Sequence, residues 1–522
     1  MRVVSNEALQ FAAPDSIRDN ILQSVERSER LGNEVLMYWG QEECEFVTRL
    51  FDYGRPNPHI PEVPAPMMRD YKWPGIYKPF NHQRDTAAFL SLRPRAFCFN
   101  EAGTGKTSAA IWAADYLMNT KRIRRALIVC PISIMYSAWQ ADIFKTAMHR
   151  TANVAYGPPE KRKKILNAKY DFTIINYDGV NSMREEIERG DFDLIIIDEA
   201  NGYKNTSTKR WKTMAAILKP STWLWMMTGT PASQSPVDAF GLARLISPHR
   251  LPKFVTAWKD KVMIPVSRFT WRPKPTAKQD VFFVLQPAIR FTKSECLDLP
   301  EVVYQTRDIP MTPQVARYYK QLKGQMLIEA AGQSVSAVNA AVSVNKLLQL
   351  SGGAVYTDDK EILEFDIAPR LTALEETLDE TSNKVVVFVP FSHTITVVRE
   401  HLQNKGFSCE VIDGSVSAGR RATIINLFQT TPDPHVLVIQ PQAASHGVTL
   451  TAADTVVFWS PVVSVETYLQ CIARIDRVGQ KNRMTVVHLQ GSDVERKVYT
   501  MLQRKVDSHQ EIVDLYREEL GL

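Results

Sequence analysis

Two stretches of this 522-residue sequence repeat one alternation of short apolar runs and helical segments. The first block spans residues 76–247, and the second spans residues 370–505. Their apolar runs are residues 96–99, 126–130, 172–177, 194–198 and 224–228, then 384–389, 409–413, 435–439, 455–459 and 485–489. Short apolar runs that alternate with helices are typical of parallel sheets covered by helices. The sequence therefore predicts a duplicated α/β fold.

The segments outside the two blocks are harder to interpret. Residues 1–75 contain the proline cluster RPNPHIPEVPAP, and we expect a small N-terminal domain or arm there. Residues 248–369 are expected to form a linker and helical insertion, with a helical pattern from Thr312 to Leu350. Residues 506–522 are expected to form a C-terminal helical tail.

Composition limits the class of protein. Hydrophobic residues make up 44% and charged residues 23%, which is the usual globular mixture. No apolar run approaches the ~20 residues of a membrane span, and the N-terminus lacks the apolar core of a signal peptide. The six cysteines form no CxxC pair, so we expect them to be reduced. These features predict an intracellular chain without membrane contact, cytoplasmic or nucleoid-associated, or in the host cytoplasm if viral. We expect a monomer, and the sequence identifies no protein partner.

A glycine-bearing turn, NEAGTGKT (100–107), follows the first apolar run and precedes a helical segment. Its loop N–H groups and the helix N-terminus are suited to cradle phosphates. Lys106 is expected to reach the β- and γ-phosphates, and the Thr107 hydroxyl to ligate Mg²⁺. Asn100 departs from the pattern GxxxxGK[ST], in which a glycine stands first. The predicted ATP-binding residues of this turn are Gly103, Thr104, Gly105, Lys106 and Thr107.

Two acids end the apolar run at residues 194–198. Ligand sites of open α/β sheets collect at the carboxyl ends of strands, where Asp198 and Glu199 stand. We expect Asp198 to hold Mg²⁺ and Glu199 to orient or deprotonate the attacking water. A solvated acidic turn would explain the pair by itself, but the GKT sequence upstream favours catalysis.

These ordered motifs resemble the Swi/Snf family of superfamily-two helicase-like ATPases, from about Pro79 to Lys505. The resemblance implies two RecA-like lobes in tandem, a helical insertion and a small N-terminal appendage. It also implies that Gln83 contacts the base, and that Thr228 and Thr230 couple the nucleotide site to the nucleic-acid site. The motifs of the first block are PFNHQ (79–83), LIVCPISIMYSAWQ (127–140), IINYDGV (174–180), DEANGYKN (198–205) and MTGTPASQSPVDAFGLARLI (227–246).

The second block continues the resemblance. Gln470, Arg474 and Arg477 follow the family spacing Q-x3-R-x2-R, which implies that two guanidinium groups serve the phosphate site from the second lobe. A planar, permanently charged donor suits the negative charge of a transferring phosphoryl group. The motifs are IDGSVSAGRRATIINLF (412–428), QAASHGVTLTAADTVVFWSP (442–461) and ETYLQCIARIDRVGQ (466–480).

The resemblance also implies DNA contacts at predicted strand ends, and such contacts position DNA without reading its sequence. Serine, asparagine and lysine are common turn residues, so an ordinary turn is an equal alternative at each position. Asn201 replaces the family histidine of the DEAH box, and Ser445 and His446 replace residues that are often glycine. The implied contacts are Ser133, Tyr177, Lys204, Asn205, Ser392, His393, Ser415 and Ser445.

We therefore expect a compact, bacterial or phage-like ATP hydrolase that uses ATP and Mg²⁺. It would translocate along double-stranded or branched DNA, and would remodel DNA or displace bound proteins in repair, recombination or replication. The net charge of +6 permits such a polyanionic partner without requiring one. Three alternatives remain open: a strand-separating DNA or RNA helicase, an ATP-dependent switch or scaffold without motor activity, and the motor of a restriction system.

Overall fold

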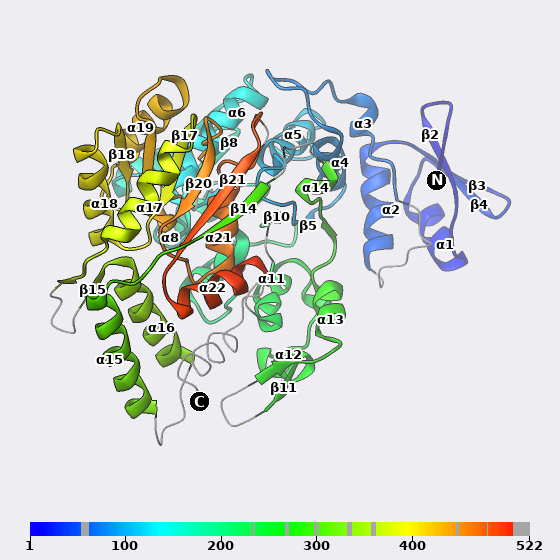
Figure 1. Ribbon diagram of the computed structural model, residues 1–522. Coiled ribbons are helices and arrows are strands. Elements are labelled where there is room, and N and C mark those ends of the chain that lie inside the picture. Colours follow the sequence, from blue (N-terminus) through cyan, green and yellow to red (C-terminus); the bar gives the residue numbers. More distant parts are fainter. Residues whose placement is uncertain are drawn as a thin grey trace. The chain divides into compact units, whose positions relative to one another are not determined.

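The computed structural model describes residues 1–53, 62–229, 231–232, 235–266, 271–296, 300, 302–330, 337–356, 362–444, 448–477 and 479–504. Contacts divide the chain into two compact units. The first unit comprises Met1–Ala232, Pro236–Met263 and Pro273–Cys296, and the second comprises Ser233–Ser235, Ile264–Arg272 and Leu297–Leu522. Figure 1 shows the chain coloured along its sequence.

A seven-stranded sheet forms the centre of the first unit, and all its strand pairs are parallel. Strands such as LIIID at 194–198 are buried along their whole length, as expected for a parallel sheet covered on both faces. Their order is β13 (Ala288–Ile289), β5 (Arg95–Cys98), β10 (Trp223–Met227), β9 (Leu194–Asp198), β6 (Ala126–Cys130), β8 (Phe172–Asn176) and β7 (Ala152–Val154).

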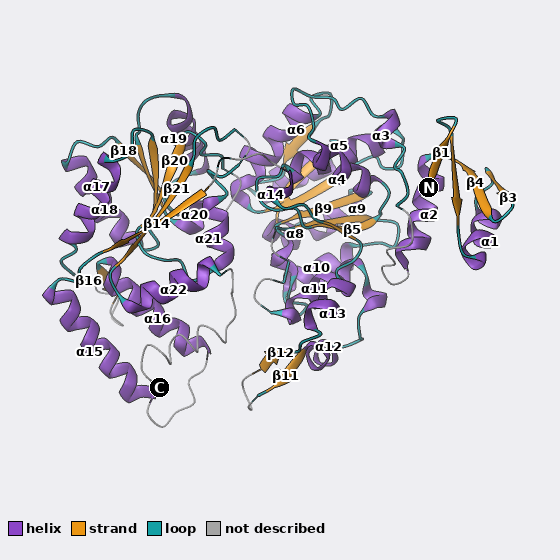
Figure 2. Ribbon diagram, turned by 45° about the vertical axis from the view of Figure 1, so that its right-hand side comes forward, coloured by secondary structure: helices purple, strands orange, loops and turns teal. Residues whose placement is uncertain are grey.

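Helices flank this sheet, and Figure 2 shows the strands between them. The helices that follow or precede these strands along the chain are α4 (Asn81–Ser91), α5 (Lys106–Asn119), α6 (Ala141–Thr146), α7 (Pro159–Asn167), α8 (Tyr177–Ser182), α9 (Arg184–Arg189), α10 (Lys209–Ile217), α11 (Ala239–Ile246), α12 (Val255–Val262), α13 (Ala277–Val284) and α14 (Lys293–Cys296). Short helical turns at Ile132–Ile134 and Met135–Gln140 follow β6, and β11 (Met263–Pro265) pairs with β12 (Trp271–Pro273).

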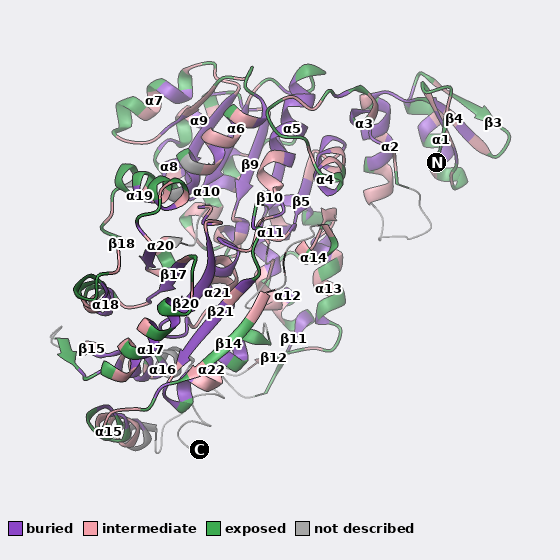
Figure 3. Ribbon diagram, turned by 45° about the horizontal axis from the view of Figure 1, so that its top comes forward, coloured by how far each residue is buried: buried purple, intermediate pink, exposed green. Residues whose placement is uncertain are grey.

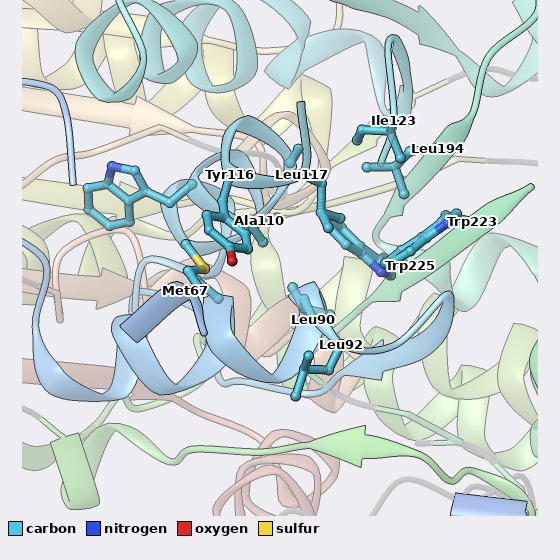
Figure 4. Close-up of a cluster of buried hydrophobic side chains, with 14 of the residues drawn as sticks. Met67, Leu90, Leu92, Ala110, Tyr116, Leu117, Ile123, Leu194, Trp223 and Trp225 are labelled. Atoms are coloured by element: carbon cyan, nitrogen blue, oxygen red, sulfur yellow. The ribbon is translucent and has the colours of Figure 1, made fainter. Parts of the chain in front are cut away.

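The first 75 residues contain an antiparallel sheet in the order β1-β2-β4-β3. Its buried side chains share one hydrophobic cluster with α4 and α5, where Met67 lies near Tyr116 and Ala110 (Figure 4). Arg122 adds ion pairs to Glu42 and Glu45. The elements are β1 (Arg2–Val4), β2 (Ala8–Ala12), α1 (Asp15–Ser24), β3 (Ser28–Leu31), β4 (Glu34–Tyr38), α2 (Gln41–Tyr53) and α3 (Met67–Asp70).

A six-stranded parallel sheet forms the centre of the second unit. In Figure 3 its inner strands are buried, whereas helices such as α18 and α19 carry exposed faces. The order is β14 (Val302–Asp308), β21 (Met484–Gln490), β20 (Ala453–Phe458), β17 (Lys384–Phe388), β19 (Val436–Ile439) and β18 (Cys409–Ile412). The two parallel sheets confirm the predicted pair of RecA-like lobes.

The second unit also contains helices and a short hairpin, β15 (Ala354–Tyr356) with β16 (Ile362–Glu364). The helices are α15 (Pro313–Ala330), α16 (Ala337–Gly352), α17 (Ala368–Asp379), α18 (Ser392–Asn404), α19 (Ala418–Thr430), α20 (Pro441–Ala444), α21 (Val465–Ile472) and α22 (Asp493–Gln503). Among the described residues of both units, no helix combines the length and apolarity that a bilayer crossing needs.

The region expected to bridge the blocks, residues 248–369, divides between the two units. In its first part, the residues up to Met263 and from Pro273 to Cys296 belong to the first unit, whereas Ile264–Arg272 belongs to the second. β13 adds an edge strand to the first unit's sheet. Its second part supplies β14, an edge strand of the other sheet, and the helices α15 and α16. The expected C-terminal tail, 506–522, lies outside the described residues.

Candidate active site

The loop between β5 and α5 has the backbone shape of an anion site. Gly103 and Gly105 have φ angles of 91° and 79°, in the left-handed region that favours glycine. Gly105 caps α5, which begins at Lys106. The first N–H groups of a helix have no partner within it, and the helix dipole makes this end positive. A phosphate is therefore expected here, beside the half-buried side chains of Lys106 and Thr107.

The first turn of α4 braces this loop. Gln83 places its Nε2 3.4 Å from the Thr104 carbonyl oxygen and 3.5 Å from that of Gly105. The neighbouring His82 places its Nε2 2.8 Å from the same Thr104 oxygen. Thr104 is buried, so the peptide in the middle of the loop is held from behind by α4.

Asn100, which replaces the usual first glycine, also has a defined place. It is buried, its Nδ2 donates to Thr86 Oγ1 at 2.8 Å, and its Oδ1 accepts the Phe291 N–H at 3.0 Å. The side chain therefore joins the loop to α4 and to the segment after β13. A glycine would supply neither hydrogen bond.

The acid pair, Asp198 and Glu199, lies at the carboxyl end of β9. The Trp139 side chain holds the Asp198 carboxylate, and the Tyr177 hydroxyl holds the backbone of both acids. Asp198 is buried, with Oδ2 accepting Trp139 Nε1–H at 2.9 Å and Oδ1 accepting the Glu199 N–H at 3.0 Å. The Tyr177 hydroxyl donates to the carbonyl oxygens of Asp198 and Glu199. Burial, followed by the Glu199 and Asp198 charges, raises the pKa of Tyr177 well above its usual value. The hydroxyl therefore remains a donor.

Glu199 adopts φ 51° and ψ 54°, a left-handed conformation that is uncommon for a residue with a side chain. Such backbone strain persists only where the surroundings impose it, and it is frequent at functional sites. The Tyr177 hydroxyl supplies part of that constraint. Sequence reasoning placed Tyr177 among DNA contacts and did not single out Trp139, since a tryptophan in an apolar motif resembles any core residue.

The segment after β10 lies against the phosphate loop. Thr228 is buried, and its N–H donates to the Cys98 carbonyl oxygen at 3.1 Å. A Cβ added to Gly229 would lie 3.3 Å from the backbone nitrogen of Ala102. Thr228 thus connects β10 to the start of the loop, while Thr230 lies outside the described residues.

Charges of opposite sign meet at this edge of the sheet. Burial raises the pKa of the Cys98 thiol to about 11, with Lys106 opposing the rise and Asp198 adding to it. Thr107 and Asp198 offer hard oxygen donors, which Mg²⁺ prefers, and the described residues contain no group of three or more His, Cys, Asp or Glu suited to a metal. This sparse donor set fits Mg²⁺, because that ion usually keeps several waters and takes further ligands from substrate phosphates.

In the second unit, one helix and the turn after it carry the predicted Gln-Arg-Arg set. Gln470, on α21, donates from Nε2 to Glu466 Oε1 at 3.4 Å. Arg474 is buried and donates from Nε to the Gln470 carbonyl oxygen at 2.9 Å. Arg477 is half-buried and donates from Nη1 to the Val448 carbonyl oxygen at 3.3 Å. The two guanidinium groups are therefore ordered by backbone carbonyls.

The implied DNA contacts of the first unit follow β6, β8 and β9 at the carboxyl edge of its sheet. Ser133 lies in the helical turn after β6. Lys204 Nζ lies 3.4 Å from Asp238 Oδ2. Asn205 Oδ1 accepts the N–H and hydroxyl of Ser207 at 2.9 and 2.8 Å. Asn205 thus has a turn-forming role in addition to any contact with DNA.

In the second unit, the implied contacts follow β17 and β18. Ser392 and His393 begin α18, and His393 Nε2 lies 2.9 Å from Glu364 Oε1. The Ser415 hydroxyl donates to Asp413 Oδ1 at 2.6 Å. Ser445 lies outside the described residues. The polar groups of each unit therefore gather at the carboxyl edge of its own sheet.

Two family models match the chain. The SNF2-related domain matches residues 82–370, more than half of the sequence. The helicase conserved C-terminal domain matches residues 369–479. The first match contains the phosphate loop and the acid pair, and the second contains Gln470, Arg474 and Arg477.

Curated relatives are longer than this chain. An uncharacterised ATP-dependent helicase of Mycoplasma genitalium is 25% identical over 75% of this chain and 37% of its own length. The SWI/SNF-related matrix-associated actin-dependent regulator of chromatin subfamily A-like protein 1 of Xenopus tropicalis is 25% identical over 86% of this chain and 46% of its own length. A solved SWI2/SNF2 ATPase core of Sulfolobus solfataricus with dsDNA aligns at 21% identity and a TM-score of 0.42, over 83% of this chain and 92% of that one. The chain thus spans less than half the length of the curated relatives it matches.

Proposed function

Because this chain belongs to the SNF2-related family of helicase-like ATPases, we propose that it hydrolyses ATP when bound to DNA and uses that energy to translocate along the duplex. The observation that carries the proposal is the first unit's edge, where a left-handed glycine loop, Lys106, Asp198 and Glu199 meet. Phosphoryl transfer depends mainly on positioning and on neutralising charge, and these groups supply both.

Different residues of this site bind the phosphates, hold Mg²⁺ and act on the attacking water in the proposed reaction. The N–H groups at the start of α5 and the Lys106 ammonium bind the β- and γ-phosphates. Thr107 and Asp198 would hold Mg²⁺, which supplies further charge neutralisation on the phosphates. Glu199 orients the attacking water and takes its proton, from a position that the Tyr177 hydroxyl and the Asp198 side chain hold in place.

The second unit completes the reaction in this proposal. Arg474 and Arg477 neutralise the charge that develops on the γ-phosphoryl group, a task to which planar guanidinium groups are suited. Hydrolysis would then depend on both units, which is the basis for converting ATP turnover into movement.

The proposed partner is double-stranded or branched DNA. One relative, 23% identical over 80% of this chain and 42% of the relative's own length, is named chromodomain-helicase-DNA-binding protein 1-like, from Danio rerio. Polar side chains at the two sheet edges, among them Lys204 and Ser392, suit contacts to phosphates and sugars rather than to bases. We propose binding that is nearly independent of DNA sequence, by a chain that acts as a monomer inside the cell.

ATP hydrolysis should be measured with double-stranded, single-stranded, forked and four-way DNA and with RNA as separate activators. We expect duplex-containing DNA to stimulate turnover most and RNA least. Turnover that no nucleic acid changes would overturn the DNA part of the proposal while leaving ATP hydrolysis intact. A second candidate is strand separation, because the Mycoplasma relatives are named ATP-dependent helicases.

A further inference from the structure

Residues 251–296 carry a concentration of positive charge. They contain nine lysines and arginines but three aspartates and glutamates, a net charge of +6 that equals the net charge of the whole chain. The charges of all other residues therefore cancel. None of the predicted ATP or DNA contacts lies in this segment, which includes α12 and α13 of the first unit. A basic segment of this density attracts polyanions, for a purpose that the motifs do not supply.

One face of α13 is turned to solvent. Ala277 and Val284 are buried, whereas Lys278 and Phe282 are exposed. Phe282 is 61% exposed, so most of this residue is open to solvent. Residues four apart lie on the same side of a helix, so the lysine and the phenylalanine are neighbours.

The start of α12 repeats this combination. Phe254, just before the helix, is 62% exposed, and Lys253 Nζ lies 5.4 Å from the centroid of its ring. The packing of α12 uses a different aromatic side chain. Trp258 is buried and donates from Nε1 to the Pro236 carbonyl oxygen at 3.2 Å. The exposed ring of Phe254 therefore contributes little to holding the helix in place.

The two lysine–phenylalanine pairs lie close together in the first unit. Figures 1 and 2 show α12 next to α13, and Lys261 Nζ lies 2.9 Å from Asp280 Oδ1 between them. Arg250 Nη1 donates to the Phe283 carbonyl oxygen at 3.0 Å, beside the exposed end of α13. Four residues span at most about 14 Å, so Phe254 is within that distance of Arg250. One short strand can therefore reach both pairs.

The end of α13 lies at the amino edge of the first unit's sheet. Ser247 Oγ donates to the Val284 carbonyl oxygen at 2.7 Å. Arg95, the first residue of β5, donates from Nη1 to the Leu245 carbonyl oxygen at 2.8 Å. The phosphate loop follows the opposite, carboxyl end of β5. Phe282 is therefore remote from the phosphate loop and from the edge where the predicted DNA contacts gather.

Exposed aromatic rings beside lysines are the two components of a surface for unpaired nucleic acid. Every base has a flat face that stacks on an aromatic ring, and the lysines neutralise the phosphates of the same strand. In a duplex the neighbouring base pairs already cover these faces, so the rings favour a single strand. Phenylalanine has no group that reads a base edge, so such binding tolerates any sequence.

We propose that Lys253, Phe254, Lys278 and Phe282 form a second nucleic-acid surface, which binds an unpaired strand by stacking and by phosphate contacts. This inference goes beyond translocation along the duplex, and it rests on the proposed function only in taking DNA as the partner. It gives the first unit a contact for the tails, forks or gaps of a DNA substrate, separate from the site of ATP hydrolysis.

The test measures the affinity of the full chain for a labelled single strand of about 12 nucleotides, by fluorescence anisotropy without ATP. Phe254→Ala and Phe282→Ala should each weaken binding about tenfold, because each removes the stacking of one base. Lys253→Ala and Lys278→Ala should each reduce the slope of log K against log salt by about 0.7, the value for one phosphate contact on a single strand. A fluorescent purine analogue in the strand should lose emission with the unmodified chain and keep it when both phenylalanines are replaced.

Phe144→Ala and Lys164→Ala are the matched controls. Phe144 is 73% exposed on α6, and Lys164 is exposed on α7 within another basic run of the same unit. Both variants should bind the strand as the unmodified chain does. If they weaken binding as much as the four test variants, any exposed ring or lysine suffices and the inference is overturned. Normal binding by Phe254→Ala and Phe282→Ala would overturn it as well.

Polyglutamate tests the other class of polyanion. If the chain binds it as tightly as the single strand, and the phenylalanine variants weaken both ligands equally, the partner is an acidic protein and the assignment to nucleic acid is wrong. We expect weaker binding of polyglutamate, unaffected by the loss of either ring, because glutamate side chains have no flat face to stack.

Stimulation of ATP hydrolysis by a blunt duplex separates this inference from the proposed function. A blunt duplex offers no unpaired strand, so the four variants should be stimulated as the unmodified chain is. A chain that binds the single strand but whose turnover ignores every DNA would refute the proposed function and retain the second surface. Loss of duplex stimulation in the four variants, with unchanged binding of the single strand, would show that these residues serve the duplex instead.

Discussion

At the scale of single residues, Lys106 and Glu199 act at different stages of one reaction. Lys106 binds phosphate in the ground state, whereas Glu199 acts on the attacking water. Lys106→Ala should therefore weaken ATP binding, and Glu199→Gln should retain bound ATP but lower turnover by 100-fold or more. Interactions used only in the transition state affect kcat and not binding, so nucleotide titration and steady-state turnover separate the two. An equal loss of ATP affinity in both variants would contradict these roles.

Tyr177 offers a second test at this scale, because two roles have been assigned to it. If its hydroxyl holds the backbone of the acid pair, Tyr177→Phe should lower kcat about tenfold at saturating DNA and leave the dissociation constant for DNA unchanged. The phenylalanine ring retains the edge-on packing against Tyr203. A weaker affinity for DNA with normal kcat would instead identify Tyr177 as a DNA contact.

The sequence predicts the residue types of the active site better than their partners. Lys106, Asp198 and Glu199 were identifiable because a glycine loop and an acidic strand end are rare in combination. The support of Asp198 by Trp139 was not identifiable, because 59 residues separate them and the hydrogen bond depends on the three-dimensional course of the chain. The same holds for Asn100, whose partners Thr86 and Phe291 come from two distant segments.

At the scale of elements, a buried aromatic cluster supports α21, the helix that carries Gln470. The Tyr468 hydroxyl lies 2.8 Å from His488 Nε2, and the His488 ring stacks on Tyr499 with centroids 4.2 Å apart. Phe458 lies against both Tyr468 and His488. Burial lowers the pKa of His488 to about 4, so the imidazole is neutral near pH 7.

This shift gives the second unit a pH dependence with a defined sign. Between the folded pKa of about 4 and the unfolded value of about 6.5, the unfolded chain binds more protons, so stability falls as the pH falls through that window. Going from pH 7 to pH 5 should lower the free energy of unfolding by about 2 kcal/mol through this residue. This change in the free energy of unfolding is measured by hydrogen exchange of the β20 and β21 amides, corrected for the intrinsic pH dependence of exchange.

His488→Phe is the comparison for this prediction, because it retains an aromatic ring and removes the titration. The variant should lose the part of the acid sensitivity that His488 contributes, while other groups retain theirs. Identical acid sensitivity in the variant and the unmodified chain would mean that folding does not lower the pKa of His488 below its unfolded value.

The strands followed directly from the sequence, and the exceptions have physical reasons. All ten apolar runs correspond to strands. Nine of them are inner strands, which in a parallel sheet are buried on both faces and must be apolar. Edge strands escape this requirement. β14 includes Gln305, Thr306 and Arg307, and β7 and β13 have three and two residues, too short for a pattern. The N-terminal antiparallel sheet was missed because strands such as β2 and β4 bury alternate side chains and therefore show no continuous apolar run.

For the whole molecule, the proposed mechanism of ATP hydrolysis uses both units in each turnover. An arginine that neutralises a transferring phosphoryl group can contribute about 10³-fold to the rate. Arg477→Ala should therefore lower kcat by about this factor and leave ATP and DNA affinities nearly unchanged. Arg477→Lys should recover little, because an ammonium lacks the planar fork. Arg496→Ala, which removes an arginine of the same unit paired with Asp308 and Asp493, should turn over normally. A near-normal rate in Arg477→Ala would show that another group performs this task.

The central claim is movement along duplex DNA powered by ATP, and triplex displacement tests it most directly. A labelled third strand is annealed to a duplex, and its release is followed with ATP, without ATP, and with the Glu199→Gln variant. We expect release only when ATP is hydrolysed, while a plain tailed duplex stays paired. Efficient unwinding of the tailed duplex with the triplex left intact would contradict the account and identify a strand-separating helicase.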